Sequence, residues 1–333
     1  MDKTIYNFTI NLNKEEYIVV DAIECITLAD SFLKNKIGTG HGEAKLYVGN
    51  ESEHLSNFFS NLREENCFFR KNDFLSFLVD AETEYKEPQQ EYLKKDQMPT
   101  LYNNLKSELL NFKNELLKFT LYRVNVAGPR LYMNSNSIYY DFMRSIGLPN
   151  ISYLSVLKIK KINDEKIYFY FKMFIDYKLG ITGYQTMEEK QQTETINLST
   201  DLSIENKQTL MQARVGQGKY RDKLLKECVF CPFTMINDKR LLIASHIKPW
   251  VNSNNNEKID PKNGFIFTPT FDKLFDKGFI TFNEDKTIKI SPWISPENQE
   301  RLNIYNGKFL PNLPVDRKRE KYLKYHRKFI FKE

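Results

Sequence analysis

Cysteine and long apolar segments are scarce in this chain of 333 residues. It has only Cys25, Cys67, Cys228 and Cys231, which are too few and too unevenly spread for a disulfide framework. We therefore expect a reducing, cytoplasmic location. No run of about 18 apolar residues occurs, and the N-terminus lacks an apolar targeting core, so we expect neither a membrane span nor a secretory signal.

A strong excess of either charge is also lacking. The 49 Lys and Arg residues against 43 Asp and Glu residues give a formal net charge of +6. This slight basic excess favours a polyanionic partner, although many enzymes without one share it. Hydrophobic residues make up 41% of the chain, which is enough for a substantial core and excludes a disordered chain. The length favours two domains.

The first half of the chain predicts helices followed by strands, which is a mixed α+β pattern. Apolar residues spaced three and four apart predict helices over the following ranges: 14–36, 53–64 and 99–118. Segments rich in β-branched and aromatic residues predict strands over these ranges: 119–126, 152–162 and 166–177. The last two strands are expected to form a hairpin.

Residues 182–210 are polar and show little apolar periodicity, which is typical of a linker or a long exposed loop. We place a domain boundary near residue 205. The expected domains are 1–205, helical and then strand-rich with a polar linker at its end, and 206–333.

The segment after this boundary predicts a compact unit in the order strand, strand, helix. A helix fits 217–227, and the strand 241–247 carries His246 near its end. A second strand fits 264–268, and a short helix fits 269–278, where Gly278 closes it.

This unit carries side chains suited to phosphodiester hydrolysis, which needs a base for water and a cation for the developing charge. His246 is one of four histidines and titrates near neutrality. Asp272 and Asp276 lie four residues apart, on one side of the expected helix. Carboxylates suit Mg²⁺ or Mn²⁺. Asn263 precedes Gly264 at the hairpin, where its amide could fix the loop.

Several lysines surround these residues, as expected where a DNA backbone docks: Lys248, Lys262, Lys273 and Lys277. Each feature alone has an ordinary structural explanation. A single histidine at a strand end is usually structural, and Asn-Gly is usually a turn. The ordered combination is therefore what favours a nuclease.

Residues 212–333 resemble the HNH, or ββα-metal, endonuclease family, and in particular its branch among bacterial restriction endonucleases. The resemblance is carried by these segments: RVGQGKYR (214–221), Cys228, SHIKPW (245–250), DPKNGFIF (260–267), FDKLFDKGFITF (271–282) and YLKYHRKFIF (322–331). It implies a C-terminal ββα-metal nuclease domain that cleaves double-stranded DNA with a divalent metal.

The resemblance also implies roles for single residues. His246 occupies the general-base position and Asn263 the middle position. Asp272 stands where many relatives have a final histidine, which would make it a metal ligand. Many relatives carry an acidic ligand directly before the base, where this chain has Ser245. The metal would then be held by Asp272, the DNA phosphate, waters and Asp276.

Structural zinc is not expected, although some HNH enzymes use two Cys-x-x-Cys pairs to bind it. Cys228 and Cys231 form one such pair, and no nearby pair completes four ligands. The basic segment at the C-terminus predicts an amphipathic helix whose apolar side docks on the nuclease core. A phosphate contact from Arg317, Lys318 or Arg319 is an alternative.

A bare ββα unit reads little sequence, so the first 200 residues are expected to form a separate DNA-recognition domain. Within 126–144, four side chains are of types that read base edges: Arg130, Asn134, Asn136 and Arg144. An ordinary loop between strands is the alternative for each of them.

The full hypothesis is a sequence-specific type II restriction endonuclease. Its expected setting is the cytoplasm, with a cognate DNA methyltransferase as a genetic partner and a homodimer on DNA to cut both strands. A nuclease that requires methylated DNA would share every catalytic residue and stays open. A DNA-binding protein with an inactive nuclease unit also stays open, because of Ser245 and Asp272.

Overall fold

A computed structural model describes residues 8–39, 42, 44–60, 62, 66–163, 166–176, 187–214 and 218–333. It has the mixed α+β architecture that the sequence predicts. Residues 7–186 form one compact unit, and residues 187–333 belong to a second. Residues 187–214 therefore belong with the C-terminal segment.

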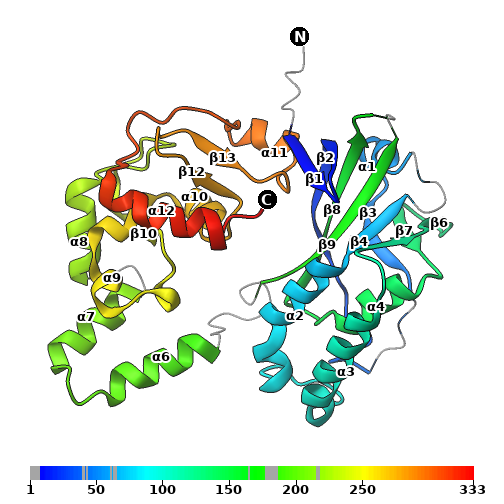
Figure 1. Ribbon diagram of the computed structural model, residues 1–333, viewed down its shortest axis with the longest axis horizontal. Helices are drawn as coiled ribbons and strands as arrows, with labels where there is room; N and C mark the ends of the chain where they lie inside the picture. Colours follow the sequence, from blue (N-terminus) through cyan, green and yellow to red (C-terminus); the bar gives the residue numbers. More distant parts are fainter. Residues whose placement is uncertain are drawn as a thin grey trace. The chain divides into compact units, whose positions relative to one another are not determined.

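A six-stranded sheet, in the order β1-β2-β8-β9-β4-β5, is the centre of the first unit (Figure 1). Its strands are β1 (Phe8–Leu12), β2 (Glu15–Thr27), β4 (Cys67–Arg70), β5 (Leu116–Phe119), β8 (Ser152–Lys161) and β9 (Ile167–Ile175). All neighbours are antiparallel except β4 and β9. The predicted pairing of 152–162 with 166–177 is confirmed, while Asp164 in the turn lies outside the described residues.

The described residues of this unit form four helices: α1 (Glu53–Phe58), α2 (Lys71–Lys86), α3 (Met98–Asn111) and α4 (Ile138–Ile146). A 3-10 turn, η1 (Lys95–Gln97), leads into α3. Helix α2 packs on β4 and β9, and α3 packs on α2. The core between them is rich in aromatic side chains, such as Phe69, which packs against the rings of Phe74, Phe119 and Phe171.

The helix predicted over 14–36 is wrong, because residues 15–27 form strand β2. Two irregularities in its pairing with β8, between Val19 and Asp21 and between Ile23 and Ile26, break the alternation of a regular strand. The buried residues consequently fall at positions 17, 19, 22 and 26. The spacings of three and four that result imitate a helix.

A second, three-stranded sheet in the order β3-β7-β6 completes the first unit. Its strands are β3 (Leu46–Asn50), β6 (Tyr122–Val124) and β7 (Arg130–Asn134). Helix α4 follows β7 directly and begins at the N-cap Ser137, whose hydroxyl accepts from the Tyr139 N–H.

The polar segment 182–210 is not a linker throughout, because it contains α6 (Met187–Leu198) and the beginning of α7 (Ile204–Arg214). Ile196 and Leu210 pack with Trp250 in a small cluster that belongs to the second unit. These few apolar residues explain why periodicity missed both helices. Residues 177–186 lie outside the described residues.

The rest of the second unit contains two hairpins and several helices. The strands are β10 (Ile243–His246), β11 (Gly264–Phe267), β12 (Ile280–Phe282) and β13 (Ile288–Ile290). The helices are α8 (Gly218–Glu227), α9 (Asn255–Ile259), α10 (Pro269–Asp276), α11 (Pro296–Arg301) and α12 (Arg317–Phe329). The 3-10 turns are η2 (Lys239–Leu241), η3 (Trp250–Asn252) and η4 (Pro261–Asn263).

Helix α12 docks on the nuclease core as predicted, with Leu323 and His326 fully buried. Within the described ranges, no helix combines the length and the apolarity needed to cross a membrane.

Candidate active site

The predicted order of strand, strand and helix is present around His246. Strand β10 pairs antiparallel with β11, and His246 lies opposite Gly264 in this register. Helix α10 follows β11 after one residue, Thr268, and contacts both strands. Gly278 closes the helix with a positive φ of 69°. The fold thus brings the end of β10 next to the helix that carries the two aspartates.

One ring nitrogen of His246 is held by the backbone. Its Nε2 lies 3.0 Å from the carbonyl oxygen of Lys258. A carbonyl oxygen can only accept, so Nε2 carries the proton in the neutral ring. The Nδ1 atom then keeps its lone pair, as a general base for water requires.

The charge state of His246 follows from its surroundings. Burial lowers its pKa below the ordinary value, while the hydrogen bond to Lys258 and the negative charge of Asp276 oppose this shift. The lowered pKa keeps the ring neutral at pH 7. The effect of Asp276 also shows that α10 presents this carboxylate within electrostatic range of the ring.

Tyr220 of α8 fixes the plane of the His246 ring. The two rings are stacked, with centroids 4.4 Å apart and an interplanar angle of 5°. The Tyr220 hydroxyl donates to the Asn263 carbonyl oxygen at 3.1 Å. A Cβ at Gly264 would lie 2.2 Å from this hydroxyl and 3.1 Å from the Ser245 carbonyl oxygen. Glycine is therefore required where Tyr220 and β10 approach the hairpin.

Asn263 ties together the loop that follows His246. Its side chain is fully buried, and its Oδ1 accepts from the Lys248 N–H at 2.8 Å. Its Nδ2 donates to the carbonyl oxygens of Lys248 at 3.2 Å and Glu257 at 3.1 Å, and to the Ser253 hydroxyl at 3.3 Å. The amide thus bridges both ends of the segment 248–257, which lies directly before the carbonyl that holds His246.

A second histidine of this unit, His326, has a structural role. Its ring stacks on Phe275 at 4.0 Å, its Nε2 donates to the Phe275 carbonyl oxygen, and its Nδ1 accepts from the Thr281 hydroxyl. Burial lowers its pKa to about 4. His326 therefore stays neutral and anchors α12 to the end of α10, while His246 is the histidine of the site.

Asp272 and Asp276 lie one turn apart on α10, with Asp272 half-buried and Asp276 exposed. Among the described residues, no three His, Cys, Asp or Glu side chains lie together as a metal-binding group. The described residues therefore show no metal site that is built from protein ligands alone. Two carboxylates do fit Mg²⁺, which keeps several waters and completes its ligands with substrate phosphates.

Lysines border the site on two sides. Lys273 is exposed and Lys277 half-buried on α10. Lys248 forms an ion pair with Glu257 at 2.7 Å, and its ammonium lies 5.4 Å from the centre of the Tyr325 ring.

Lys248 and Glu257 also line a cavity of about 440 Å³, together with residues of α12 and the α9–η4 turn. Its other lining residues are Asp260, Lys318, Lys321, Tyr322 and Tyr325. Its wall therefore shares the segment that holds His246.

Lys262 and Arg319, both considered as phosphate contacts, instead join internal ion pairs. Lys262 bonds to Glu227 at 2.8 Å and to Asp316 at 3.0 Å. Arg319 is 1% exposed and bonds to the same two carboxylates, at 2.8 and 2.9 Å, and to the Gly264 carbonyl oxygen. These charges connect α8, η4 and α12, so a buried guanidinium is not available to DNA.

Two residues outside the sequence motifs, Gln192 and Lys258, contact the loop that follows His246. Gln192 of α6 donates to the Val251 carbonyl oxygen and accepts from the Lys258 ammonium at 3.0 Å. Lys258 is 4% exposed, and its ammonium lies 4.0 Å from the centre of the Trp250 ring. No sequence pattern predicted a role for Gln192, because nothing local predicts that α6 docks here. Tyr220 lies within the segment 214–221, but the sequence did not predict its role.

Cys228 and Cys231 are both buried, and Cys228 contacts Arg319. The Cys228 thiol accepts from Arg319 at 3.6 Å, and burial raises its pKa to about 11. The Cys231 thiol lies 3.7 Å from the Thr268 hydroxyl. The Cys228 thiol therefore stays protonated at neutral pH, and both buried side chains serve as packing groups.

In the first unit, the four predicted base-reading residues separate into two groups. Arg130 is exposed on β7, and Asn134 and Asn136 lie on or just after it. The Asn134 Oδ1 accepts from the Ser135 N–H, and the Asn136 Oδ1 from the Tyr122 hydroxyl.

Arg144 lies apart from these three, at the end of α4. Its guanidinium donates to the Phe32 carbonyl oxygen at 3.0 Å and to Asp141 at 3.1 Å, and it lies against the Phe32 ring. These contacts give Arg144 a structural role that its residue type alone did not predict.

The site so described has a histidine with a basic Nδ1 within electrostatic range of Asp276, and a second carboxylate, Asp272, one turn away on α10. Residues 228–283 match the family described as HNH endonuclease. The match covers β10, β11 and α10, and with them His246, Asn263 and both aspartates. It supports membership of the HNH family for this domain and therefore a nuclease that acts on DNA. HNH nucleases generally depend on a divalent metal. No curated protein matches the chain.

Proposed function

We propose that the chain is a sequence-specific type II restriction endonuclease that hydrolyses double-stranded DNA with Mg²⁺ or Mn²⁺. The observation that supports this most strongly is the state of His246, whose Nε2 is bound to the Lys258 carbonyl while Nδ1 remains basic. The separate unit 7–186 supports the proposal that cleavage is sequence-specific, because hydrolysis alone needs no second domain of this size.

In the proposed reaction, His246 Nδ1 accepts a proton from water as the water oxygen attacks phosphorus. The bond to the 3′ oxygen breaks, leaving a 5′-phosphate and a 3′-hydroxyl that takes its proton from solvent. Asp272 and Asp276 would hold the cation together with the DNA phosphate and waters. The cation, when bound, would neutralise charge on the phosphate and leaving oxygens.

The remaining residues position these groups or bind DNA. Tyr220 and Asn263 are positioning residues, since both act on His246 or its loop. Phosphate contacts are proposed for Lys248, Lys273 and Lys277 of the second unit. Base contacts are proposed for Arg130, Asn134 and Asn136 of the first. A dimer on DNA would cut both strands, and a cognate methyltransferase would protect the host.

Digestion of unmethylated phage DNA tests the specificity. We expect discrete fragments that require Mg²⁺ or Mn²⁺ and share one sequence at their ends. A metal-dependent smear would contradict sequence specificity but would still support nuclease activity. Cleavage confined to methylated copies of the same DNA would show the modification-dependent alternative to be right.

A further inference from the structure

A cavity in the first unit has the chemistry of a nucleotide site. It has a volume of about 580 Å³ and lies between the segment 34–36 and the start of α3. This volume is in the range of small-molecule and cofactor pockets. No residue of the cavity belongs to the proposed catalytic machinery.

One wall of the cavity carries a largely buried amide that offers a hydrogen-bond acceptor. Asn35 is 9% exposed, and its Nδ2 donates to the carbonyl oxygens of Ser145 at 2.6 Å and Gly147 at 3.0 Å. These bonds fix the orientation of the amide. Its Oδ1 accepts no hydrogen bond from the described residues, so it is the atom left for a ligand.

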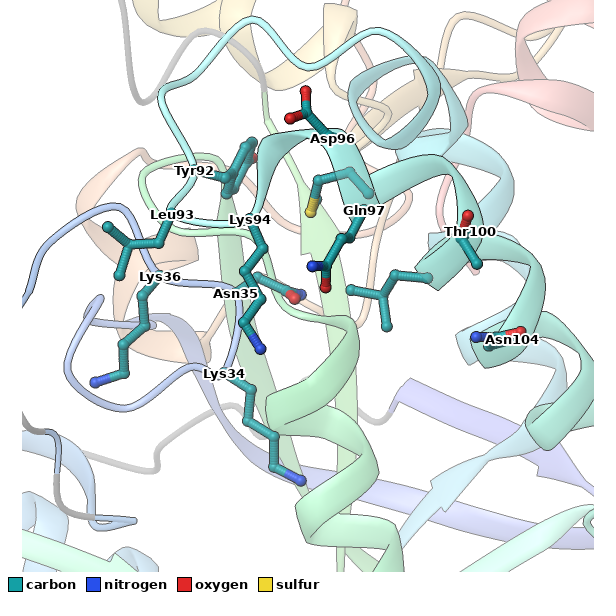
Figure 2. Close-up of a pocket in the computed structure, with 12 residues that line it drawn as sticks. Lys34, Asn35, Lys36, Tyr92, Leu93, Lys94, Asp96, Gln97, Thr100 and Asn104 are labelled. Carbon is teal, nitrogen blue, oxygen red and sulfur yellow. The ribbon is translucent and has the colours of Figure 1, made fainter.

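Polar ends converge beside this amide. Figure 2 shows the amides of Asn35 and Gln97 and the ammonium of Lys94 directed into the same space. Gln97 and Lys94 are both exposed, and the Lys94 ammonium forms no hydrogen bond or ion pair with the described residues. An amide pair offers donors and acceptors to the edge of a base, and the ammonium suits a phosphate.

The remaining walls are cationic on one side and apolar on the other. Lys34 and Lys36 line the cavity with Lys94, against one carboxylate, Asp96. The Lys34 ammonium is also paired with Asp141 at 2.5 Å. The apolar wall consists of Tyr92, Leu93, Met98 and Leu101. An apolar wall beside cations fits a base joined to its phosphate.

We propose that this cavity binds a single nucleotide of DNA whose base has left the stack. The Asn35 Oδ1 accepts from an amino or imino group of the base, the apolar wall covers its face, and Lys94 binds the adjoining phosphate. The proposal rests on the proposed role of residues 7–186 in DNA recognition. A free nucleotide shares this chemistry, and the test distinguishes the two sources.

The test uses the full chain with His246→Ala, so that DNA remains intact during binding. Gln97→Trp fills the cavity from an exposed position, and Lys94→Gln removes the phosphate-binding charge. Lys113→Gln is the matched control, because Lys113 is exposed and lies outside the cavity. Binding to labelled phage DNA fragments, made with cytosine or 5-methylcytosine, is measured against salt concentration. Circular dichroism confirms that each variant is folded.

We expect Gln97→Trp to weaken DNA binding at least tenfold. Lys94→Gln should reduce the slope of log affinity against log salt by about one, as for one lost phosphate contact, and Lys113→Gln should not. Calorimetry with dCMP, dAMP and inorganic phosphate forms the second arm. Nucleotide binding that Gln97→Trp abolishes, with unchanged DNA binding, would identify a free nucleotide as the source.

The proposal is wrong if Gln97→Trp and Lys94→Gln alter neither DNA nor nucleotide binding. It is also wrong if inorganic phosphate binds as tightly as dCMP and dAMP while DNA binding is unchanged, because the base would then contribute nothing. None of these readouts requires cleavage. A chain that binds nucleotides but never cuts DNA would therefore refute the proposed nuclease and leave this site standing.

Discussion

Replacing Asn263 by alanine should remove the hydrogen bonds that hold the loop after His246. The amide makes four hydrogen bonds, through one acceptor and two N–H donors, to Lys248, Ser253 and Glu257. At about 1 kcal/mol for each donor or acceptor, and with buried partners left unsatisfied, the loss should be about 3–5 kcal/mol. That is a large part of the stability of a typical domain, which is about 5–15 kcal/mol.

Tryptophan emission provides a selective assay, because both tryptophans of the chain, Trp250 and Trp293, lie in the second unit. Urea unfolding followed at this signal should shift to lower urea in Asn263→Ala. Asn312→Ala, at an exposed asparagine, should change the free energy of unfolding by less than about 0.5 kcal/mol. Ser253→Ala removes one of these contacts, together with the bonds from its hydroxyl to the carbonyl oxygens of Lys248 and Pro249, and should fall between them. An unchanged midpoint in Asn263→Ala would refute the role given to the amide.

Four further predictions concern other groups of the site. The pKa of His246 is lower in the folded than in the unfolded chain. Activity should therefore persist below pH 6.5, and the free energy of unfolding should fall as the pH drops through this range. An acid limb centred above pH 6.5 in the pH–rate profile would contradict this prediction. Gly264→Ala displaces Tyr220 and should lower kcat at least tenfold, whereas equal kcat would show that the contact is dispensable. Arg319→Ala removes a buried guanidinium that bonds to Glu227, Asp316 and the Gly264 carbonyl oxygen, and should lower the free energy of unfolding by about 3–5 kcal/mol in urea. Gln192→Ala should lower kcat about tenfold with little change in KM, and Gln192→Glu, which keeps the bond to the Lys258 ammonium, should retain more activity.

The local elements of the nuclease segment could be predicted because their signals are local. Strand β10 ends at His246 and α10 starts at Pro269, and both boundaries follow from turn residues and short apolar patterns. The same reasoning failed at β2, where two pairing irregularities gave a strand the spacing of a helix. It also failed at α6 and α7, whose docking depends on a few apolar contacts with Trp250.

Residue type indicated which side chains suit DNA chemistry, but not which partners they meet. Lys262 and Arg144 have the charge that a phosphate or a base edge requires. Their partners, Glu227 for the one and Phe32 for the other, are 35 and 112 residues away in sequence. Only the fold brings such pairs together, so no local pattern distinguishes a structural cation from a DNA-binding one.

The central claim is that His246 is the base of a metal-dependent DNA nuclease. Its most direct test is the rate at which wild-type protein and His246→Ala nick supercoiled plasmid in Mg²⁺, with tryptophan emission as the control for folding. Loss of a general base should slow the reaction by about 10²–10⁴-fold. A folded His246→Ala variant that nicks DNA within about threefold of the wild-type rate would contradict the claim.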